Sequence, residues 1–194
     1  MRVMLYTDVL DCGGKERQVT EIAKGLVRAG ACRVFEVLVV VMERAGFYDP
    51  ILEAAGIRIA RLVRRWRWDP FIPISLRKII RDFDPDIIHT FSPMTSFYTS
   101  LTPRGGQARF VENSTQNAFR PRSWMEKAIH AIAFRAADQV VGNSFAGLEA
   151  KEAPRRKAAV LYNGFDFKRI QGLPEADAVQ IGRASCRERV LRLV

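Results

Sequence analysis

Residues 2–41 read RVMLYTDVLDCGGKERQVTEIAKGLVRAGACRVFEVLVVV. The apolar run 2–7 predicts a strand, apolar residues at helical spacing over 14–30 predict a helix that stops at Gly30, and 34–41 predicts a second, buried strand. Two strands joined by a helix lie parallel in one sheet. This stretch therefore favours an α/β protein whose sheet is covered by helices.

The same alternation continues along the chain. We expect further strands over 57–63, 86–90, 108–112, 139–142 and 158–162, and helices over 50–56, 74–83, 93–101, 123–137 and 144–153. Seven strands with helices between them predict one α/β domain, a doubly wound and mainly parallel Rossmann-like sheet. Ligands of such sheets bind beyond the carboxyl ends of the strands, so functional residues are expected there.

Composition narrows the class of protein. The 194 residues, 48% of them hydrophobic, suffice for one domain with a core. The chain has no apolar run long enough for a membrane span and no signal peptide, so a cytoplasmic protein is expected. Cys12, Cys32 and Cys186 lack metal-ligand spacing, so we expect reduced thiols and no metal ion.

The last residues differ in character from the rest. Residues 171–180 are expected to form a linker, and 181–190 read IGRASCRERV, which resembles a translated sequencing adapter and shows no apolar period. We interpret residues 181–194 as a non-native tail, with a genuine basic helix as the alternative. The tail holds four arginines against one glutamate, so it supplies part of the formal net charge of +10.

Four short segments at predicted strand ends are the candidates for chemistry. They are CGGKERQ at 12–18, PDIIHTFSP at 85–93, AADQVVGNSFAGLE at 136–149 and AVLYNGFD at 159–166. In the first, two glycines let a ligand approach the backbone, and the helix behind them points N–H groups outward, which suits a phosphate. The turn is neither GxGxxG nor a Walker A loop, so dinucleotide oxidoreductases and P-loop NTPases lose support. A plain tight turn is the alternative.

The other segments also allow a structural interpretation. His89 ends a buried strand and is either a hydrogen-bonded wall residue or a ligand contact. Asn143 and Ser144 follow a strand and are able to cap the next helix. Asn163 and Gly164 close a strand with a turn.

In their order and spacing, GGKERQ, PDIIHTF, ADQVVGNS and VLYNGFD together resemble the N-terminal domain of family 4 glycosyltransferases of the GT-B fold, over residues 1–170. The resemblance implies two Rossmann-like domains across a cleft, the first binding the acceptor and the second a nucleotide sugar. It also implies sugar transfer to a glycan or lipid-linked acceptor with retention of configuration, without a metal ion or other cofactor. No two glutamates are eight positions apart, as the Glu-x7-Glu element of the second domain requires. We therefore expect that this chain lacks the donor-binding domain and is inactive alone.

The resemblance also implies roles for residues at matching positions. The backbone of Gly13 and Gly14 would approach the donor diphosphate, with Lys15, Glu16 and Arg17 at the mouth of the cleft. The residues expected to line the cleft are His89, Ser92, Asn143, Ser144 and Asn163, with Gly164 and Asp166 just before the interdomain hinge.

This sequence departs from the family after the fifth strand. Many relatives have a histidine there, near the transferring sugar, whereas this chain reads FVENSTQNAFRPRS over 110–123. The candidates to replace it are Glu112, Asn113, Gln116 and Asn117. His130 lies within a predicted helix, where a structural role is expected.

The segment RLVRRWRWDPF, residues 61–71, is rich in arginine and tryptophan. This is the composition of a surface that rests on anionic lipid headgroups, so we hypothesise peripheral contact with the inner face of the cytoplasmic membrane. The alternatives are a solvated loop packed on the domain and a site for an anionic acceptor. The residues concerned are Arg61, Arg64, Arg65, Trp66, Arg67 and Trp68.

Two other functions stay open. A GT-B sugar-nucleotide epimerase or phosphorylase would share the same sheet. A non-catalytic nucleotide- or nucleic-acid-binding module is supported mainly by the positive charge, but no RNA- or DNA-binding motif appears, so no nucleic-acid partner is expected. The donor sugar, the acceptor, the linkage and the oligomeric state are not encoded in any recognisable pattern.

Overall fold

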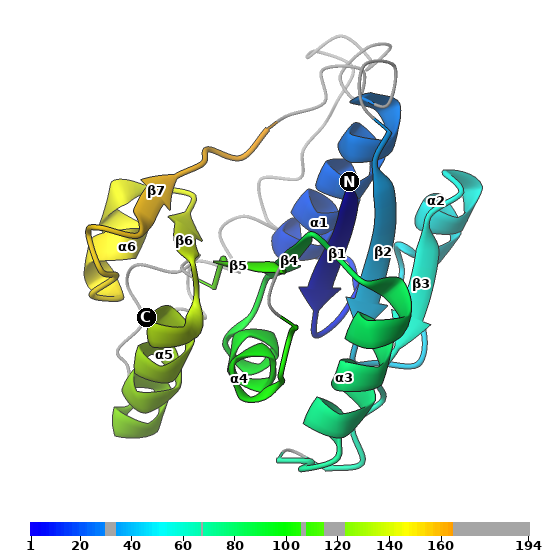
Figure 1. The fold of residues 1–194 in the computed structure, drawn as a ribbon. Coiled ribbons are helices and arrows are strands. Elements are labelled where there is room, and N and C mark those ends of the chain that lie inside the picture. Colours follow the sequence, from blue (N-terminus) through cyan, green and yellow to red (C-terminus); the bar gives the residue numbers. More distant parts are fainter. Residues whose placement is uncertain (30–33, 67, 106–107, 115–122, 165–194) are drawn as a thin grey trace, which may run out of the picture. The chain divides into compact units, whose positions relative to one another are not determined.

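The computed structural model describes residues 1–29, 34–66, 68–105, 108–114 and 123–164, and in these ranges strands and helices alternate (Figure 1). The strands are β1 (Arg2–Thr7), β2 (Glu36–Val41), β3 (Arg58–Arg61), β4 (Ile87–Thr90), β5 (Arg109–Glu112), β6 (Gln139–Gly142) and β7 (Ala158–Val160). The helices are α1 (Gly14–Arg28), α2 (Asp49–Ala54), α3 (Ile72–Phe83), α4 (Pro93–Leu101), α5 (Trp124–Ala136) and α6 (Phe145–Ala150). Every predicted element is present, with ends shifted by at most three residues.

The seven strands form one parallel sheet in the order β3-β2-β1-β4-β5-β6-β7, which confirms the predicted doubly wound α/β fold. β1 lies inside the sheet, where Leu5 pairs with Val39 of β2 on one side and with His89 of β4 on the other. The chain first builds outward from β1 to β3 and then crosses back to β4. The direction of winding therefore reverses between β1 and β4, and this is the switch point of the sheet.

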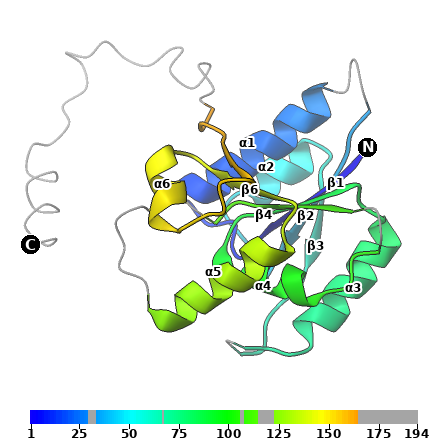
Figure 2. The ribbon, with the colours of Figure 1, turned by 60° about the vertical axis from the view of Figure 1, so that its left-hand side comes forward.

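Helices cover both faces of the sheet. Successive residues of a strand point to opposite faces, and in the central strands both sets are largely apolar. Met4 and Tyr6 of β1 pack in one cluster with residues of α3 and α4, whereas Val3 and Leu5 pack with residues of α1 and α2. Figure 2 shows α1 and α2 on one side of the sheet and α3, α4 and α5 on the other. A third cluster joins Phe110 of β5 to residues of α5 and α6. The sheet thus has α1 and α2 on one face and the four later helices on the other.

Residues Met1–Asn163 form one compact unit. The predicted linker at 171–180 and the predicted tail at 181–194 lie outside the described residues, as does the end of the predicted domain beyond Gly164. Those boundaries stay predictions.

Candidate functional site

The carboxyl ends of the strands lie along one edge of the sheet, because every strand pair is parallel. Three of the segments singled out in the sequence contain the ends of β4, β6 and β7, and the first, 12–18, begins in the loop between β1 and α1. Their described residues therefore lie along this single edge. Ligands of doubly wound sheets bind at the switch point, which here is bordered by the loop after β1 and the loop after β4.

The two glycines after β1 differ in their surroundings. Gly13 caps α1 in an extended conformation (φ −134°, ψ 167°), and its N–H donates to the carbonyl of Asp11 at 2.8 Å. A Cβ at Gly13 would collide with the carboxylate of Glu16, whereas a Cβ at Gly14 would meet nothing. Gly13 thus lies against the Glu16 carboxylate, whereas Gly14 is exposed backbone at the start of a 15-residue helix.

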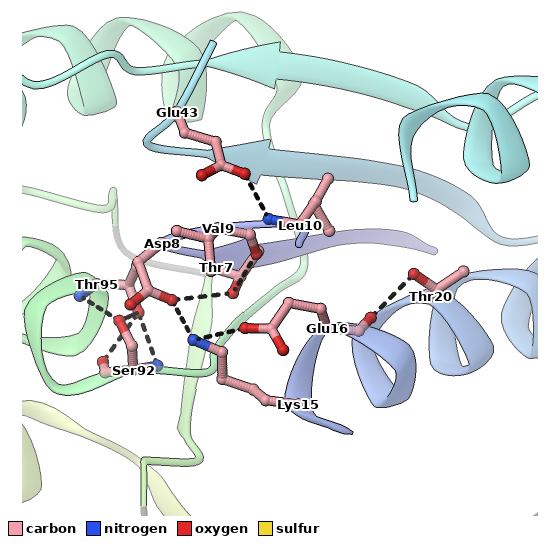
Figure 3. Close-up of polar contacts among 10 residues, drawn as sticks. All are labelled: Thr7, Asp8, Val9, Leu10, Lys15, Glu16, Thr20, Glu43, Ser92 and Thr95. Carbon is pink, nitrogen blue, oxygen red and sulfur yellow. Dashed lines mark hydrogen bonds and ion pairs between the residues drawn. The ribbon is translucent and has the colours of Figure 1, made fainter. Parts of the chain in front are cut away.

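Lys15, in the first turn of α1, is held between two carboxylates (Figure 3). Its Nζ contacts Asp8 Oδ1 and lies 3.2 Å from Glu16 Oε1. Asp8 and Lys15 are partly exposed, whereas Glu16 is buried. The group therefore keeps one uncompensated negative charge. Asp8 was not among the predicted site residues, since sequence alone marks it only as the end of a strand.

Neighbouring contacts fix the loop after β1. Glu43, which follows β2, accepts the N–H of Leu10 at 2.9 Å (Figure 3). The hydroxyl of Thr7 lies 3.3 Å from the carbonyl of Val9. Arg17, predicted at the mouth of the cleft, is half-buried in the first turns of α1.

His89 is a buried residue of β4 on the α1 side of the sheet. Its ring lies 4.2 Å from that of Phe91, which belongs to the core cluster of α1 and α2. Burial lowers the pKa of His89 to about 4, so the imidazole is neutral at neutral pH. Its Nε2 is buried and has no hydrogen-bond partner among the described residues. These features suit a wall residue, and they also leave one nitrogen available for a ligand.

The structure separates two residues that the sequence left equivalent. Glu112 is fully buried and accepts the hydroxyl of Ser96 on α4, so it lies on the face covered by the later helices. Asn113 directly follows the last residue of β5, so the alternation of side chains along the strand assigns it to the opposite face, that of His89. The N–H of Asn113 donates to the carbonyl of Thr90 at 3.0 Å, and its Oδ1 is buried without a hydrogen-bond partner in the described part of the chain. Gln116 and Asn117, the other two candidates, lie outside the described residues.

Glu112, Ser114 and His130 form a chain of contacts that has the composition of a catalytic triad. Ser114 Oγ contacts Glu112 Oε1 and lies 3.3 Å from His130 Nδ1. All three residues are buried: Glu112 is 0% exposed, Ser114 7% and His130 1%. No substrate reaches this hydroxyl, so the arrangement is structural.

The two serines predicted in the cleft cap helices. Ser92 Oγ accepts the N–H of Thr95 at 3.3 Å, while Thr95 Oγ1 accepts the N–H of Ser92 at 3.1 Å. Ser144 Oγ accepts the N–H of Gly147 at 3.1 Å and lies 3.4 Å from Asn143 Oδ1. Capping accounts for both hydroxyls, and Asn143 is half-buried at the end of β6.

Beyond β7, Asn163 and Gly164 are exposed where the described chain ends. Asp166, predicted near the hinge, lies outside the described residues. A largely apolar pocket of about 410 Å³ lies between α6 and β7, lined among others by Phe145, Leu148 and Val160. It is at the outer edge of the sheet and away from the switch point.

The basic-aromatic loop, residues 62–71 between β3 and α3, is anchored to the domain. Asp69 accepts the N–H groups of Arg65 and Phe71 at 3.0 Å each, and these hydrogen bonds hold the pKa of its carboxyl below the usual range. Trp68 packs edge-on against Phe97 of α4 with ring centroids 5.9 Å apart. These contacts tie Arg65 and residues 68–71 to the domain.

The arginines of this region do not share one role. Arg61 pairs with Asp49 at 2.5 Å, and Arg64 is half-buried, where its charge lowers the pKa of Tyr98 against the larger effect of burial. Arg65 is exposed. Arg67 lies outside the described residues.

Large apolar side chains of the same region face solvent. Trp66 is 53% exposed, Phe71 54% and Ile74, at the start of α3, 67%. Exposed apolar side chains grouped on one fixed segment are uncommon on a surface that contacts water alone.

Two kinds of feature are absent from the described residues. No group of three or more histidine, cysteine, aspartate or glutamate side chains is placed to hold a metal ion. No helix in the described ranges is both long enough and apolar enough to cross a bilayer.

These observations define a class: a doubly wound Rossmann-like domain with a glycine turn, a helix N-terminus and several polar side chains beside its switch point. The model of Glycosyltransferase Family 4 matches residues 12–169, and the chain belongs to this family. A comparison with curated proteins gave no match.

Solved structures share the fold. HepE of Anabaena, in complex with UDP and glucose, has a TM-score of 0.70 at 18% identity, over 86% of this chain and 45% of that one. The lipopolysaccharide outer core galactosyltransferase WaaB, in its apo form, has a TM-score of 0.66 at 13% identity, over 91% and 50%. A UDP-N-acetylglucosamine 2-epimerase has a TM-score of 0.59 at 16% identity, over 84% and 48%. The chain thus spans about half the length of these proteins, and at such identities the likeness concerns the fold.

Proposed function

We propose that this chain is the acceptor-side domain of a glycosyltransferase that transfers a sugar from a nucleotide-sugar donor to a glycan or lipid-linked acceptor, with retention of configuration. The observation that carries the proposal is the exposed Gly14 backbone at the N-terminus of α1, beside the switch point of a family 4 domain. HepE, which shares the fold, was solved with UDP and glucose. A second domain would hold most of the donor.

The donor diphosphate would meet the start of α1. Free N–H groups and the positive end of the helix dipole favour a negatively charged group there. Lys15 adds a positive charge that Asp8 and Glu16 hold in place. The N–H groups, and Lys15 once the diphosphate displaces a carboxylate from it, would stabilise the charge that develops on the leaving diphosphate, and we expect no metal ion to be required.

The transferring sugar would lie against the α1 side of β4, β5 and β6. Of the residues after β5, we assign Asn113 rather than Glu112 to the position near the sugar, because Asn113 shares its face with His89. A sugar hydroxyl is able to donate to Asn113 Oδ1 and to accept from a neutral imidazole. Asn143 would extend this polar row.

We also propose that the basic-aromatic loop contacts an anionic membrane at the cytoplasmic face. Supporting this are the exposed Arg65, Trp66 and Phe71 of the loop and the exposed Ile74 at the start of α3, with Asp69 accepting the N–H groups of Arg65 and Phe71. Aromatic rings favour the headgroup level of a bilayer, and each arginine near an anionic surface adds about 1 kcal/mol of attraction. Such contact would bring the domain to a lipid-linked acceptor.

A sugar-nucleotide epimerase is the second candidate, favoured by the shared fold with UDP-N-acetylglucosamine 2-epimerase. One experiment separates the two functions. The complete protein that contains this chain would be incubated with each of a panel of UDP- and GDP-sugars, with and without lipid-linked and free glycan acceptors. Acceptor-dependent release of nucleotide, with the anomeric configuration of the product read by NMR, supports transfer. Conversion of one nucleotide sugar into its epimer without an acceptor would reject it.

A further inference from the structure

A single buried carboxyl group joins the ends of two central strands to two helices. Glu112 Oε1, at the end of β5, lies 3.2 Å from Ser96 Oγ of α4 and accepts the N–H of Ser114 at 3.1 Å. The hydroxyl of Ser114 also contacts this oxygen. Glu112 Oε2 is buried without a hydrogen-bond partner in the described part of the chain.

The ionised carboxylate sets the direction of the whole network. Because it only accepts hydrogen bonds, the hydroxyls of Ser96 and Ser114 must both donate to it. Ser96 Oγ is then free to accept from Thr90 Oγ1, 2.8 Å away, and Ser114 Oγ from His130 Nδ1, 3.3 Å away. The network therefore connects β4, α4, β5 and α5 through one charged group.

Asn113 lies between two residues that this carboxyl group fixes. On one side is Glu112 itself, and on the other is Ser114, held through both its N–H and its hydroxyl. The N–H of Asn113 is bonded to the carbonyl of Thr90, whereas its Oδ1 has no hydrogen-bond partner among the described residues. The backbone is fixed on both sides of a side chain that is left available.

We propose that Glu112 is a positioning residue, which holds the Asn113 side chain at the ligand-binding edge of the sheet and does so according to its own state of protonation. Holding a contact residue in place before the ligand arrives removes an ordering cost from binding. Only the identity of the ligand, the transferring sugar, depends on the proposed function.

The carboxyl group is placed to titrate near neutrality. Burial raises the pKa of Glu112 to about 7, against the hydrogen bonds from Ser114 and Ser96 and the charge of Lys151, which lower it. The titratable groups that face it are His130 of α5 and Lys151, which follows α6 and pairs with Glu126 at 3.3 Å. Protonation would weaken the hold on Ser114, because hydrogen bonds to a charged acceptor are the stronger ones.

The test is NMR titration of the ¹³C,¹⁵N-labelled chain between pH 5.5 and 8.5. In the wild type, the backbone amides of Asn113 and Ser114 should share one inflection near pH 7. Glu112→Gln keeps an acceptor but no titrating group, so both amides should lose the inflection while the chain stays folded. Glu126→Gln is the matched control, and it should keep the inflection.

A second variant keeps the test decisive if Glu112→Gln does not fold. Ser114→Ala retains the carboxyl group and removes its hydroxyl link, so the Glu112 side-chain carbon should still titrate while the amide of Asn113 responds at least twofold less. An inflection that persists in Glu112→Gln, or amides that do not respond to pH in the wild type, would overturn the proposal.

Addition of UDP-glucose to the complete protein that contains this chain separates this proposal from the proposed function, because a second domain would hold most of the donor. If Glu112 positions Asn113 for a sugar, the side-chain amide signal of Asn113 should shift on addition, and the shift should depend on pH in the wild type only. A pH response of the amides with no effect of UDP-glucose at any pH contradicts the assignment of Asn113 to this sugar, and leaves the positioning role of Glu112 supported.

Discussion

The ammonium group of Lys15, in the first turn of α1, contacts the carboxylate of Asp8, which directly follows β1. The pair spans the turn that carries Gly13 and Gly14, and Glu16 adds a second carboxylate at 3.2 Å. A diphosphate arriving at the start of α1 would compete with these carboxylates for Lys15.

The first prediction concerns this competition. Asp8→Asn removes one negative charge beside Lys15, so the complete protein should bind UDP about fivefold more tightly at low salt, on the order of 1 kcal/mol. Lys15→Met should weaken binding by at least as much. Titration calorimetry with UDP measures both, and Lys24→Met, which removes an ion-paired lysine elsewhere on α1, is the control. Weaker binding by Asp8→Asn would mean that Asp8 orients the lysine rather than competing for it.

The two glycines should respond differently to alanine. Gly13→Ala pushes the new Cβ into the Glu16 carboxylate, so we expect a loss of about 1 kcal/mol of stability. Gly14→Ala meets no atom and adds a better helix former, so stability should be unchanged or rise by about 0.5 kcal/mol. If Gly14 serves ligand approach, its alanine variant should nevertheless lose UDP affinity. Urea unfolding and calorimetry on the same samples check both halves, and equal stability losses would contradict the packing argument.

His89 should make the domain sensitive to acid. Burial depresses its pKa from 6.5 to about 4, so the unfolded chain binds a proton in this window that the folded chain does not. The contribution is fully present above pH 6.5 and is lost as the pH falls towards 4, by roughly 3 kcal/mol. His89→Gln should flatten this part of the stability profile relative to the wild type. If the difference in unfolding free energy between the wild type and His89→Gln is the same at pH 4.5 and pH 7, the imidazole is solvated in the folded chain.

Glu112 should act in the opposite direction. Its pKa is raised from 4.5 to about 7, so the folded chain holds a proton that the unfolded chain has lost. Stability should therefore decline as the pH rises from about 4.5 to about 7, by roughly 3 kcal/mol. Urea unfolding should show that the stability of the wild type relative to Glu112→Gln falls by most of this amount between pH 5 and pH 8. The stability of the wild type relative to the control Glu126→Gln should stay nearly constant over the same range. A wild type that gains stability relative to Glu112→Gln as the pH rises would refute the sign.

The basic-aromatic loop makes a prediction about membranes. Replacing Trp66 and Phe71 by serine together with Arg65→Glu should reduce sedimentation with anionic phosphatidylglycerol vesicles at least tenfold. Arg64 is left intact because it is half-buried beside Tyr98. Trp124→Ser with Arg135→Glu alters an exposed tryptophan and an exposed arginine of α5, away from the loop and α3, and should leave binding unchanged. Equal binding of the loop variant and the wild type would argue for one of the alternatives, a solvated loop or an acceptor site.

Much of the fold follows from local patterns. The strand β1 and the helix α4 have the predicted bounds, because strand periodicity and a helix-starting proline are written in consecutive residues. The ends of α6 and β7 were placed two or three residues too far, since periodicity alone does not mark where hydrogen bonding stops.

Only part of the candidate site could be predicted from the sequence. The positions of Gly13 and His89 along the edge of the sheet were foreseeable, because parallel strands share the edge at which they end. The ion pair between Asp8 and Lys15 was not, since it depends on how the loop after β1 returns to α1. Likewise, nothing in the run of arginines separates the half-buried Arg64 from the exposed Arg65.

By itself the sequence determined that seven strands alternate with helices in a parallel sheet, because each element needs only its own spacing of apolar residues. Only the tertiary structure decided that β1 and β4 are neighbours, and that Glu112 turns inward under α4, which assigns its neighbour Asn113 to the side of His89. Adjacent residues of a strand always point to opposite faces, but which face is buried depends on helices far away in the chain. The position of α4 therefore makes Glu112 a buried residue that holds the backbone, and leaves Asn113 as the candidate ligand contact.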